Sequence, residues 1–197
     1  MPNYWQHICN FINKLNVNMS KINSIIVFFL IISINLANAQ TIDATKFCEQ
    51  VNSILATWKT SNLTQCQGAI IGVNETLKTT KYKNNKLVDG AIKNEVLCYK
   101  DAPNLNSVSI IFYESEVFDA NSSNKFKTIF TLLKNCLKSY TVEQNAGTTI
   151  GLKDEDGDLP DFDFIKAGAP SVNISIEEPL MDKTFKVIIT IEEPADE

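Results

Sequence analysis

Apolar residues recur at helical spacing in two separate stretches of the chain. The first covers residues 43–58, and the second follows the polar residues Asn121, Ser122 and Ser123, whose oxygens can cap a helix. A period of about 3.6 residues places apolar side chains on one helical face. The sequence therefore predicts two amphipathic helices, with apolar positions at Phe47, Val51, Ile54, Leu55 and Trp58, and at Phe126, Ile129, Phe130, Leu133, Leu137 and Tyr140.

Elsewhere apolar and polar residues alternate, which is the pattern of a half-buried strand. Short β-favouring runs at 69–73 and 96–99 flank a lysine-rich segment, 81–86, that we interpret as a turn. The last two alternating segments are close enough to form an antiparallel hairpin. The alternating apolar positions are Val108, Ile110 and Phe112; Phe162 and Phe164; Val172, Ile174 and Ile176; and Phe185, Val187, Ile189 and Ile191.

The predicted order of elements is helix, strands, helix, strands. Two helices are too few to cover both faces of a sheet, so the economical arrangement is an α+β fold in which both helices pack on an antiparallel sheet as a two-layer sandwich. We expect residues 40–197 to form a single domain of this kind. The two helix-plus-strands halves are compatible with a distant internal duplication.

The N-terminus has the features of an export signal. An apolar run at 25–34 follows Lys21 and is too short to span a bilayer, and small residues at Ala37 and Ala39 suit a signal peptidase. We predict a signal peptide at 1–39, cleaved between Ala39 and Gln40, with Met19 as the true start. An uncleaved N-terminal anchor is the alternative. After cleavage we expect a secreted or periplasmic protein without a membrane span.

An even number of cysteines remains after this cleavage: Cys48, Cys66, Cys98 and Cys136. In an exported chain such a set predicts disulfides, and neither the spacing nor the histidine content suits a zinc site. We favour Cys48 with Cys66, joining the first helix to the chain that follows it, and Cys98 with Cys136, joining a strand to the second helix. The other pairings stay open.

Charge and residue content narrow the possible chemistry. The whole chain carries a net charge of −5, and loss of Lys14 and Lys21 with the signal makes it about −7, so nucleic acid is not an expected partner. The sequence has no arginine, and its single histidine, His7, precedes the cleavage site. General-base catalysis by imidazole is therefore not expected, and we predict a protein that is not an enzyme and needs no cofactor.

An acidic segment at 154–163 is the most distinctive local feature. Its carboxylates Asp154, Asp156, Asp158, Asp161 and Asp163 could converge on calcium, which takes oxygen ligands. The EF-hand pattern fails, because Leu159 and Ile165 stand where that loop needs glycine and a carboxylate. An exposed acidic turn is the alternative interpretation. The lysines of 78–86 are similarly more typical of an exposed turn than of an anion site, and Trp58 of a core residue than of a sugar platform.

The chain also resembles a group of small exported bacterial proteins without an assigned activity. The shared features are a Gly-Ala strand segment, here Gly90 and Ala91, a cysteine near its end, Cys98, and a later helix with Cys-Leu, here Cys136 and Leu137. The element order resembles the type III secretion chaperone-like fold, whose members hold partner proteins and lack catalytic machinery. The resemblance covers about 69–191, and the segment at about 142–166 departs from it.

Together these features predict an exported, non-catalytic protein-binding or chaperone-like module whose partner protein is unknown. The first alternative is a calcium-stabilised structural or cell-surface protein, and the second is a hydrolase that uses carboxylates. A binding module should expose an apolar patch or an open sheet edge. A calcium protein should bring its acidic oxygens together, and a hydrolase should have a deep pocket that contains carboxylates.

Overall fold

The computed structural model describes residues 41–61, 63–178 and 184–193. From Ile42 onward the described residues belong to one compact unit. The predicted signal peptide at 1–39, with its cleavage site and the alternative start at Met19, lies outside the described residues. None of the helices in the described part is both long enough and apolar enough to cross a bilayer.

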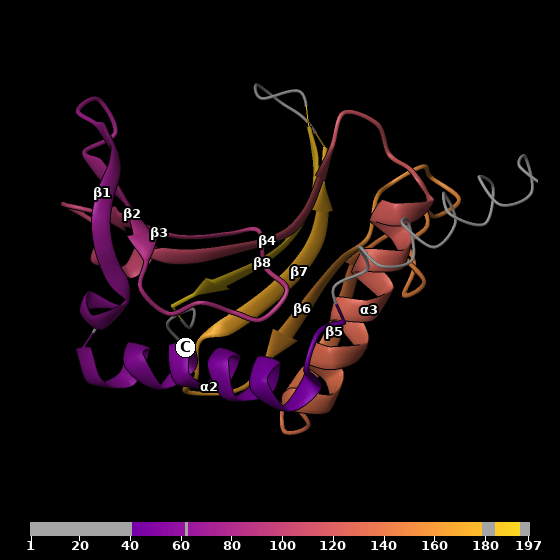
Figure 1. Cartoon of the computed structure of the whole chain (residues 1–197), viewed down its shortest axis with the longest axis horizontal. Helices are drawn as coiled ribbons and strands as arrows, with labels where there is room; N and C mark the ends of the chain where they lie inside the picture. Colours follow the sequence, from indigo (N-terminus) through magenta and orange to yellow (C-terminus); the bar gives the residue numbers. More distant parts are fainter. Residues whose placement is uncertain (1–40, 62, 179–183, 194–197) are drawn as a thin grey trace, which may run out of the picture. The chain divides into compact units, whose positions relative to one another are not determined.

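Two α-helices and one eight-stranded antiparallel sheet make up the described part of the chain, which confirms the α+β class (Figure 1). Every pair of neighbouring strands is antiparallel, and the order across the sheet is β1-β2-β3-β4-β8-β7-β6-β5. Along the chain the elements are α2 (Ala44–Ser61), η1 (Thr64–Cys66), β1 (Gln67–Asn74), β2 (Thr79–Asn84), β3 (Lys93–Tyr99), η2 (Pro103–Leu105), β4 (Ser107–Ser115), α3 (Ala120–Cys136), β5 (Thr141–Ala146), β6 (Asp161–Ile165), β7 (Ser171–Glu177) and β8 (Phe185–Glu192).

The strand order has an approximate twofold symmetry about the β4–β8 pair. Each half is a helix followed by strands that lead inward from an outer strand, β1 or β5, to a central strand, β4 or β8. Ile110 of β4 pairs directly with Ile189 of β8. The same number of residues separates Ile110 from Ile189, Val108 from Val187, and Phe47 from Phe126. This constant spacing at core positions agrees with the duplication that the sequence suggests.

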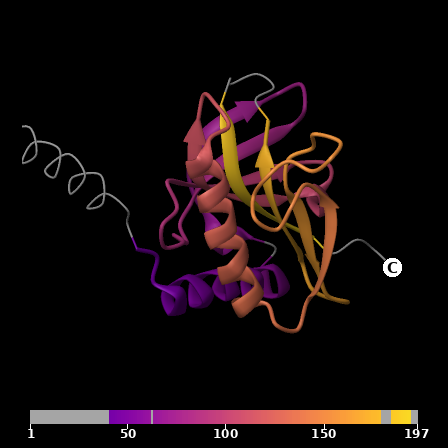
Figure 2. The same ribbon diagram turned by 90° about the vertical axis from the view of Figure 1, so that its right-hand side faces the viewer.

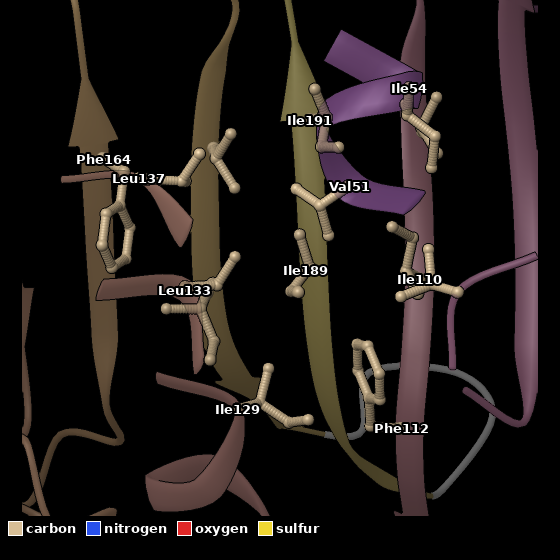
Figure 3. Close-up of a cluster of buried hydrophobic side chains, with 14 of the residues drawn as sticks. Val51, Ile54, Ile110, Phe112, Ile129, Leu133, Leu137, Phe164, Ile189 and Ile191 are labelled. Carbon is tan, nitrogen blue, oxygen red and sulfur yellow. The ribbon is translucent and has the colours of Figure 1, made fainter. Parts of the chain in front are cut away.

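One hydrophobic core contains side chains from both helices and from one face of the sheet, which we call the inner face (Figure 3). Figure 2 shows α2 and α3 on the same side of the strands. Burying each large apolar side chain contributes roughly 1.5–3 kcal/mol. Trp58 belongs to this core, as predicted. The fully buried members with the largest side chains are Phe47, Phe112, Phe126, Phe162, Phe164, Ile54, Leu63, Ile110, Ile129, Leu133, Ile174 and Ile189.

Helix α3 begins two to four residues earlier than the predicted capping residues suggest. Its N-cap is Asp119, whose carboxylate accepts a hydrogen bond from the backbone N–H of Ser122 at 2.8 Å. The Ser122 hydroxyl in return accepts from the Asp119 N–H, which completes a capping box. The bond from the Ser122 N–H is the main cause that holds the pKa of Asp119 below its usual value, and bonds that the carboxylate accepts from the side chains of Ser122, Tyr113 and Asn121 add to it. Ser122 therefore supports the cap from inside the helix.

Two strands of the sheet, β2 and β5, differ from the prediction. The segment at 81–86, predicted as a turn, lies mostly in β2, and β5 lies in the segment at 142–166 that departs from the resembling fold. The strand β2 has one large apolar residue on its inner face, Tyr82, and the first five residues of β5 are exposed. A strand without a buried apolar face lacks the alternation that periodicity detects. The strand β2 forms because it pairs with β1 and β3, and β5 forms because it pairs with β6.

The structure contains a disulfide, but the predicted pairs are wrong. Cys48 is bonded to Cys136, with Cα atoms 5.2 Å apart, and Cys66 and Cys98 are free thiols. Cys48 lies in the second turn of α2, whereas Cys66 follows the end of that helix. With a rise of about 1.5 Å per residue, about 20 Å of helix separates them, and a disulfide requires Cα atoms within about 7 Å.

The predicted Cys98–Cys136 pair fails for a reason of topology. Cys136 ends α3, where this helix meets the start of α2 and its Cys48. Cys98 lies on β3, and its Sγ accepts a hydrogen bond from the Gln67 side chain of β1 at 3.2 Å. The disulfide therefore joins the two helices, and the free thiols lie with the first strands.

Replacing Cys48 and Cys136 together by serine is expected to lower the free energy of unfolding by about 2–4 kcal/mol, because the crosslink restricts the unfolded chain. Urea denaturation without reductant measures this loss. The matched control is Cys98→Ser, which removes a sulfur without removing a crosslink and should cost less. Peptide mapping without reductant should recover Cys48 linked to Cys136, and a peptide linking Cys48 to Cys66 would contradict the structure.

Candidate functional site

The face of the sheet opposite the helices, which we call the outer face, carries a polar groove. Two hollows of about 900 and 840 Å³ form it, and both are lined by Asp163 of β6 and Glu192 of β8. We call the two hollows together the outer groove. The first hollow is mainly polar, and the second adds the apolar side chains of Leu97, Leu105 and Ile165. The acidic residues that line the outer groove are Asp158, Asp161, Asp163, Glu177, Glu178, Glu192 and Glu193.

Two of the predicted calcium ligands lie side by side in this groove. Asp161 and Asp163 are alternate residues of β6, so both project from the outer face, and Asn173 of β7 donates to both at 2.5 and 2.9 Å. Asn145 of β5 donates to Asp163 at 2.7 Å and to Asp161 at 3.4 Å. The two amides bridge adjacent carboxylates and hold them in place. Neither asparagine was singled out from the sequence, because their role depends on the β5–β6–β7 pairing.

Asp154 organises a loop instead of facing the groove. Its carboxylate accepts backbone N–H hydrogen bonds from Gly147 at 2.9 Å, Asp158 at 2.9 Å and Asp156 at 3.1 Å. Gly147 has a positive φ of 64°, and a side chain there would meet the backbone of Pro160 at 2.3 Å. The Asp154 carboxylate therefore holds the loop between β5 and β6 in a conformation in which Gly147 lies close to the backbone of Pro160.

The structure therefore divides the predicted calcium ligands between two places. Asp161, Asp163 and Asp158 line the outer groove, whereas Asp154 is used by its own loop and Asp156 lines neither hollow. Among the described residues no group of three or more His, Cys, Asp or Glu side chains is arranged to hold a metal ion. The groove offers negative charge, amides and hydroxyls, which is chemistry suited to cations and hydrogen-bond donors.

The outer strand β1 presents a second surface, which we call the β1 edge. Among the described strands, β1 pairs with β2 and has no neighbour on its other side. Ile70 and Val73, which pair with the inner-face positions Tyr82 and Thr80, are 60% and 57% exposed. Ile71 and Leu77 are also exposed. The apolar inner face therefore continues past the part that the helices cover.

Lysines line the outer face beside this edge. Lys81 and Lys83 are exposed on β2, and Lys81 lies opposite Gly72 of β1, which has no side chain to shield it. Lys81 forms an ion pair with Glu95 at 3.0 Å, whereas Lys83 has no ion pair within the described part of the chain. Lys81 and Lys83 are thus part of a strand beside the β1 edge, where we predicted a turn, whereas Lys78 and Lys86 lie in the turn and the bend on either side of β2.

The opposite outer strand, β5, has a different character. Its residues Thr141–Ala146 include exposed Val142 on the inner side, opposite Phe164, and Glu143 on the outer side, opposite Asp163. We use the name β5 edge for β5 together with the neighbouring outer-face carboxylates of β6. Glu143, Asp161 and Asp163 make the outer face acidic along this edge. The two ends of the sheet therefore carry opposite charges.

The two free thiols differ in burial but share a raised pKa. Cys66 is buried and contacts the Thr57 hydroxyl at 3.3 Å, and Cys98 is partly buried beside Gln67. Burial is the main cause that raises the pKa of both thiols above the ordinary value, with smaller opposing effects from these hydrogen bonds. A thiolate is the reactive form of cysteine. Neither thiol has the lowered pKa typical of a nucleophile.

Comparison with family models, with curated proteins and with solved structures found no match.

The Asp154 loop should depend on pH in a defined direction. Backbone hydrogen bonds, first that from the Gly147 N–H, lower the pKa of Asp154. The loop should therefore be fully ordered above the ordinary aspartate pKa of about 4 and lose order as the pH falls through the lowered value. Amide chemical shifts of Gly147 and Asp158 measure this transition. Asp154→Ala should remove it, and the control Asp156→Asn should leave it in place.

The rate of alkylation of each free cysteine should be low near neutral pH, because the raised thiol pKa leaves little of the reactive thiolate. Near neutral pH we expect iodoacetamide to modify Cys98 slowly and to leave Cys66 unmodified, and the Cys98 rate should rise as the pH increases through the raised pKa. Stability from the buried neutral thiols is complete below the ordinary pKa of about 8.5 and is lost as the pH rises further. Mass spectrometry of each cysteine peptide gives the rates. Modification of native Cys98 as fast as in urea-unfolded protein would contradict this account.

Proposed function

We propose that this chain is an exported, non-catalytic module that binds another protein through the β1 edge. The observation that carries the proposal is the exposure of Ile70, Ile71 and Val73 on an outer strand whose other side pairs with no strand in the described part of the chain. Open strands with apolar side chains are usually protected, because their free N–H and C=O groups pair readily with another chain. Retention of such a strand at the surface is best explained by a partner that covers it.

The mode of binding that suits this edge is the addition of an extended segment to the sheet. Backbone hydrogen bonds supply affinity in this mode, and alternate side chains supply specificity. Here Ile70 and Val73 would contact the partner on the inner side, and Lys81 and Lys83 on the outer side. Bulges interrupt β1 between Gln67 and Gly72, so the regular stretch is short and the affinity should be moderate.

The rest of the proposed architecture supports a binding scaffold. We infer that α2 and α3 form one layer and the sheet the other in a two-layer sandwich, which leaves the edges and the outer face accessible. The Cys48–Cys136 disulfide is compatible with an oxidising compartment outside the cytosol. Chaperone-like modules hold partners on surfaces of this kind, and the resemblance in element order favours the same role here.

The proposal can be tested with two matched variants. Val73→Lys places a charge on the β1 edge, and Val117→Lys makes the same change at a valine of similar exposure, 62% against 57%, in the β4–α3 connection. Wild type and both variants are immobilised and exposed to the exported proteins of the source cells. Quantitative mass spectrometry should find proteins that wild type and Val117→Lys retain and that Val73→Lys loses at least about tenfold, or 1.4 kcal/mol.

Equal retention by all three forms would show that the β1 edge is not the binding surface. Circular dichroism of the variants should match wild type, because both valines are exposed and neither belongs to the core. A change confined to Val73→Lys is then attributable to binding.

A further inference from the structure

The two ends of the sheet are complementary to each other. The β1 edge carries exposed Ile70 and Val73 on its inner side and Lys81 and Lys83 beside it on the outer side. The β5 edge carries Val142 on its inner side, and its outer side has the carboxylates of Glu143, Asp161 and Asp163. Apolar residues thus share the inner side of both edges, and opposite charges share the outer side.

We infer that the partner of the β1 edge is the β5 edge of a second copy of this chain, joined head to tail. This inference rests on the proposed function, since it uses the same β1 edge and names what binds there. The contact is heterologous, so each copy retains one unused edge, and further copies can add to it. The product is a chain of copies that share one continuous sheet.

Strand direction permits this contact. Every neighbouring pair in the sheet is antiparallel and β1 and β5 are the outer strands of eight, so these two run in opposite directions. A copy displaced sideways along the sheet therefore presents its β5 antiparallel to β1. The displacement also keeps the inner faces of both copies on the same side. Val142 then meets the side of the strand that carries Ile70 and Val73.

Charge distinguishes this contact from the other edge pairings. Strands lie about 4.8 Å apart, so a docked β5 lies two spacings, about 10 Å, from β2, a distance that the Lys83 and Glu143 side chains can bridge. This separation is close to the Debye length of about 10 Å at 0.1 M salt. Two β1 edges would leave the two lysine rows three spacings, about 14 Å, apart with no attraction between them, and two β5 edges would bring carboxylate rows together. The head-to-tail contact alone joins opposite charges.

Variants blocked at one edge test the inference by mixing. Val73→Lys blocks the β1 edge and leaves β5 intact, and Val142→Lys does the reverse. Wild type and each variant, purified from the exported fraction, are studied by sedimentation velocity at low and high salt, with Val117→Lys as the control. Wild type and Val117→Lys should form species larger than dimers at high protein concentration, and association should weaken as salt increases. Each blocked variant alone should associate at least about tenfold more weakly.

An equimolar mixture of the two blocked variants should form a heterodimer and stop there, because the remaining edges are both blocked. Dimers of Val142→Lys alone would show a symmetric β1–β1 contact, and dimers of Val73→Lys alone a symmetric β5–β5 contact; either result overturns the inference. Wild type that stays monomeric at low salt also overturns it. In that case selective loss of other proteins by Val73→Lys would leave the proposed function standing, so the two failures are distinguishable.

Discussion

The pairing of β4 with β8 is the contact on which the remaining structure depends. It joins the strands of the first half to those of the second, and its core residues include the directly paired Ile110 and Ile189. Each half alone would be a small sheet with one helix and little apolar area to bury. Joined at β4 and β8, the inner faces form one surface, and the shared core that α2 and α3 complete becomes large enough to be stable.

The position of that central pair also decides which strands stay at the surface. Because both halves meet at their last strands, their first strands, β1 and β5, become the two ends of the sheet. Helix α3 packs over β4, β8 and β7, whereas the β1 side chains Ile70 and Val73 remain exposed. The surface that we propose for binding is therefore a consequence of how the core is assembled. The opposite charges of the two ends follow from the lysines of β2 and the carboxylates of β5 and β6.

The chemistry of the described residues favours binding over catalysis as a proposal. The paired carboxylates Asp161 and Asp163 are held by two amides in an open groove, and the free thiols of Cys66 and Cys98 have raised pKa values. Asp154, the first of the predicted calcium ligands, is used to fasten its own loop. Side chains held in place by hydrogen bonds suit a scaffold that presents surfaces to another molecule.

The sequence by itself determined the elements that bury a face. Both amphipathic helices and the alternating strands around Ile110, Ile174 and Ile189 were predicted, since burial imposes a local period on the residues. Only the tertiary structure decided the Cys48–Cys136 pair, the exposed strands β2 and β5, and the bridge from Asn173 to Asp161 and Asp163. These features depend on contacts between residues far apart in the chain. Such contacts leave no period in the sequence, because nothing local distinguishes an exposed strand from a turn or one cysteine partner from another.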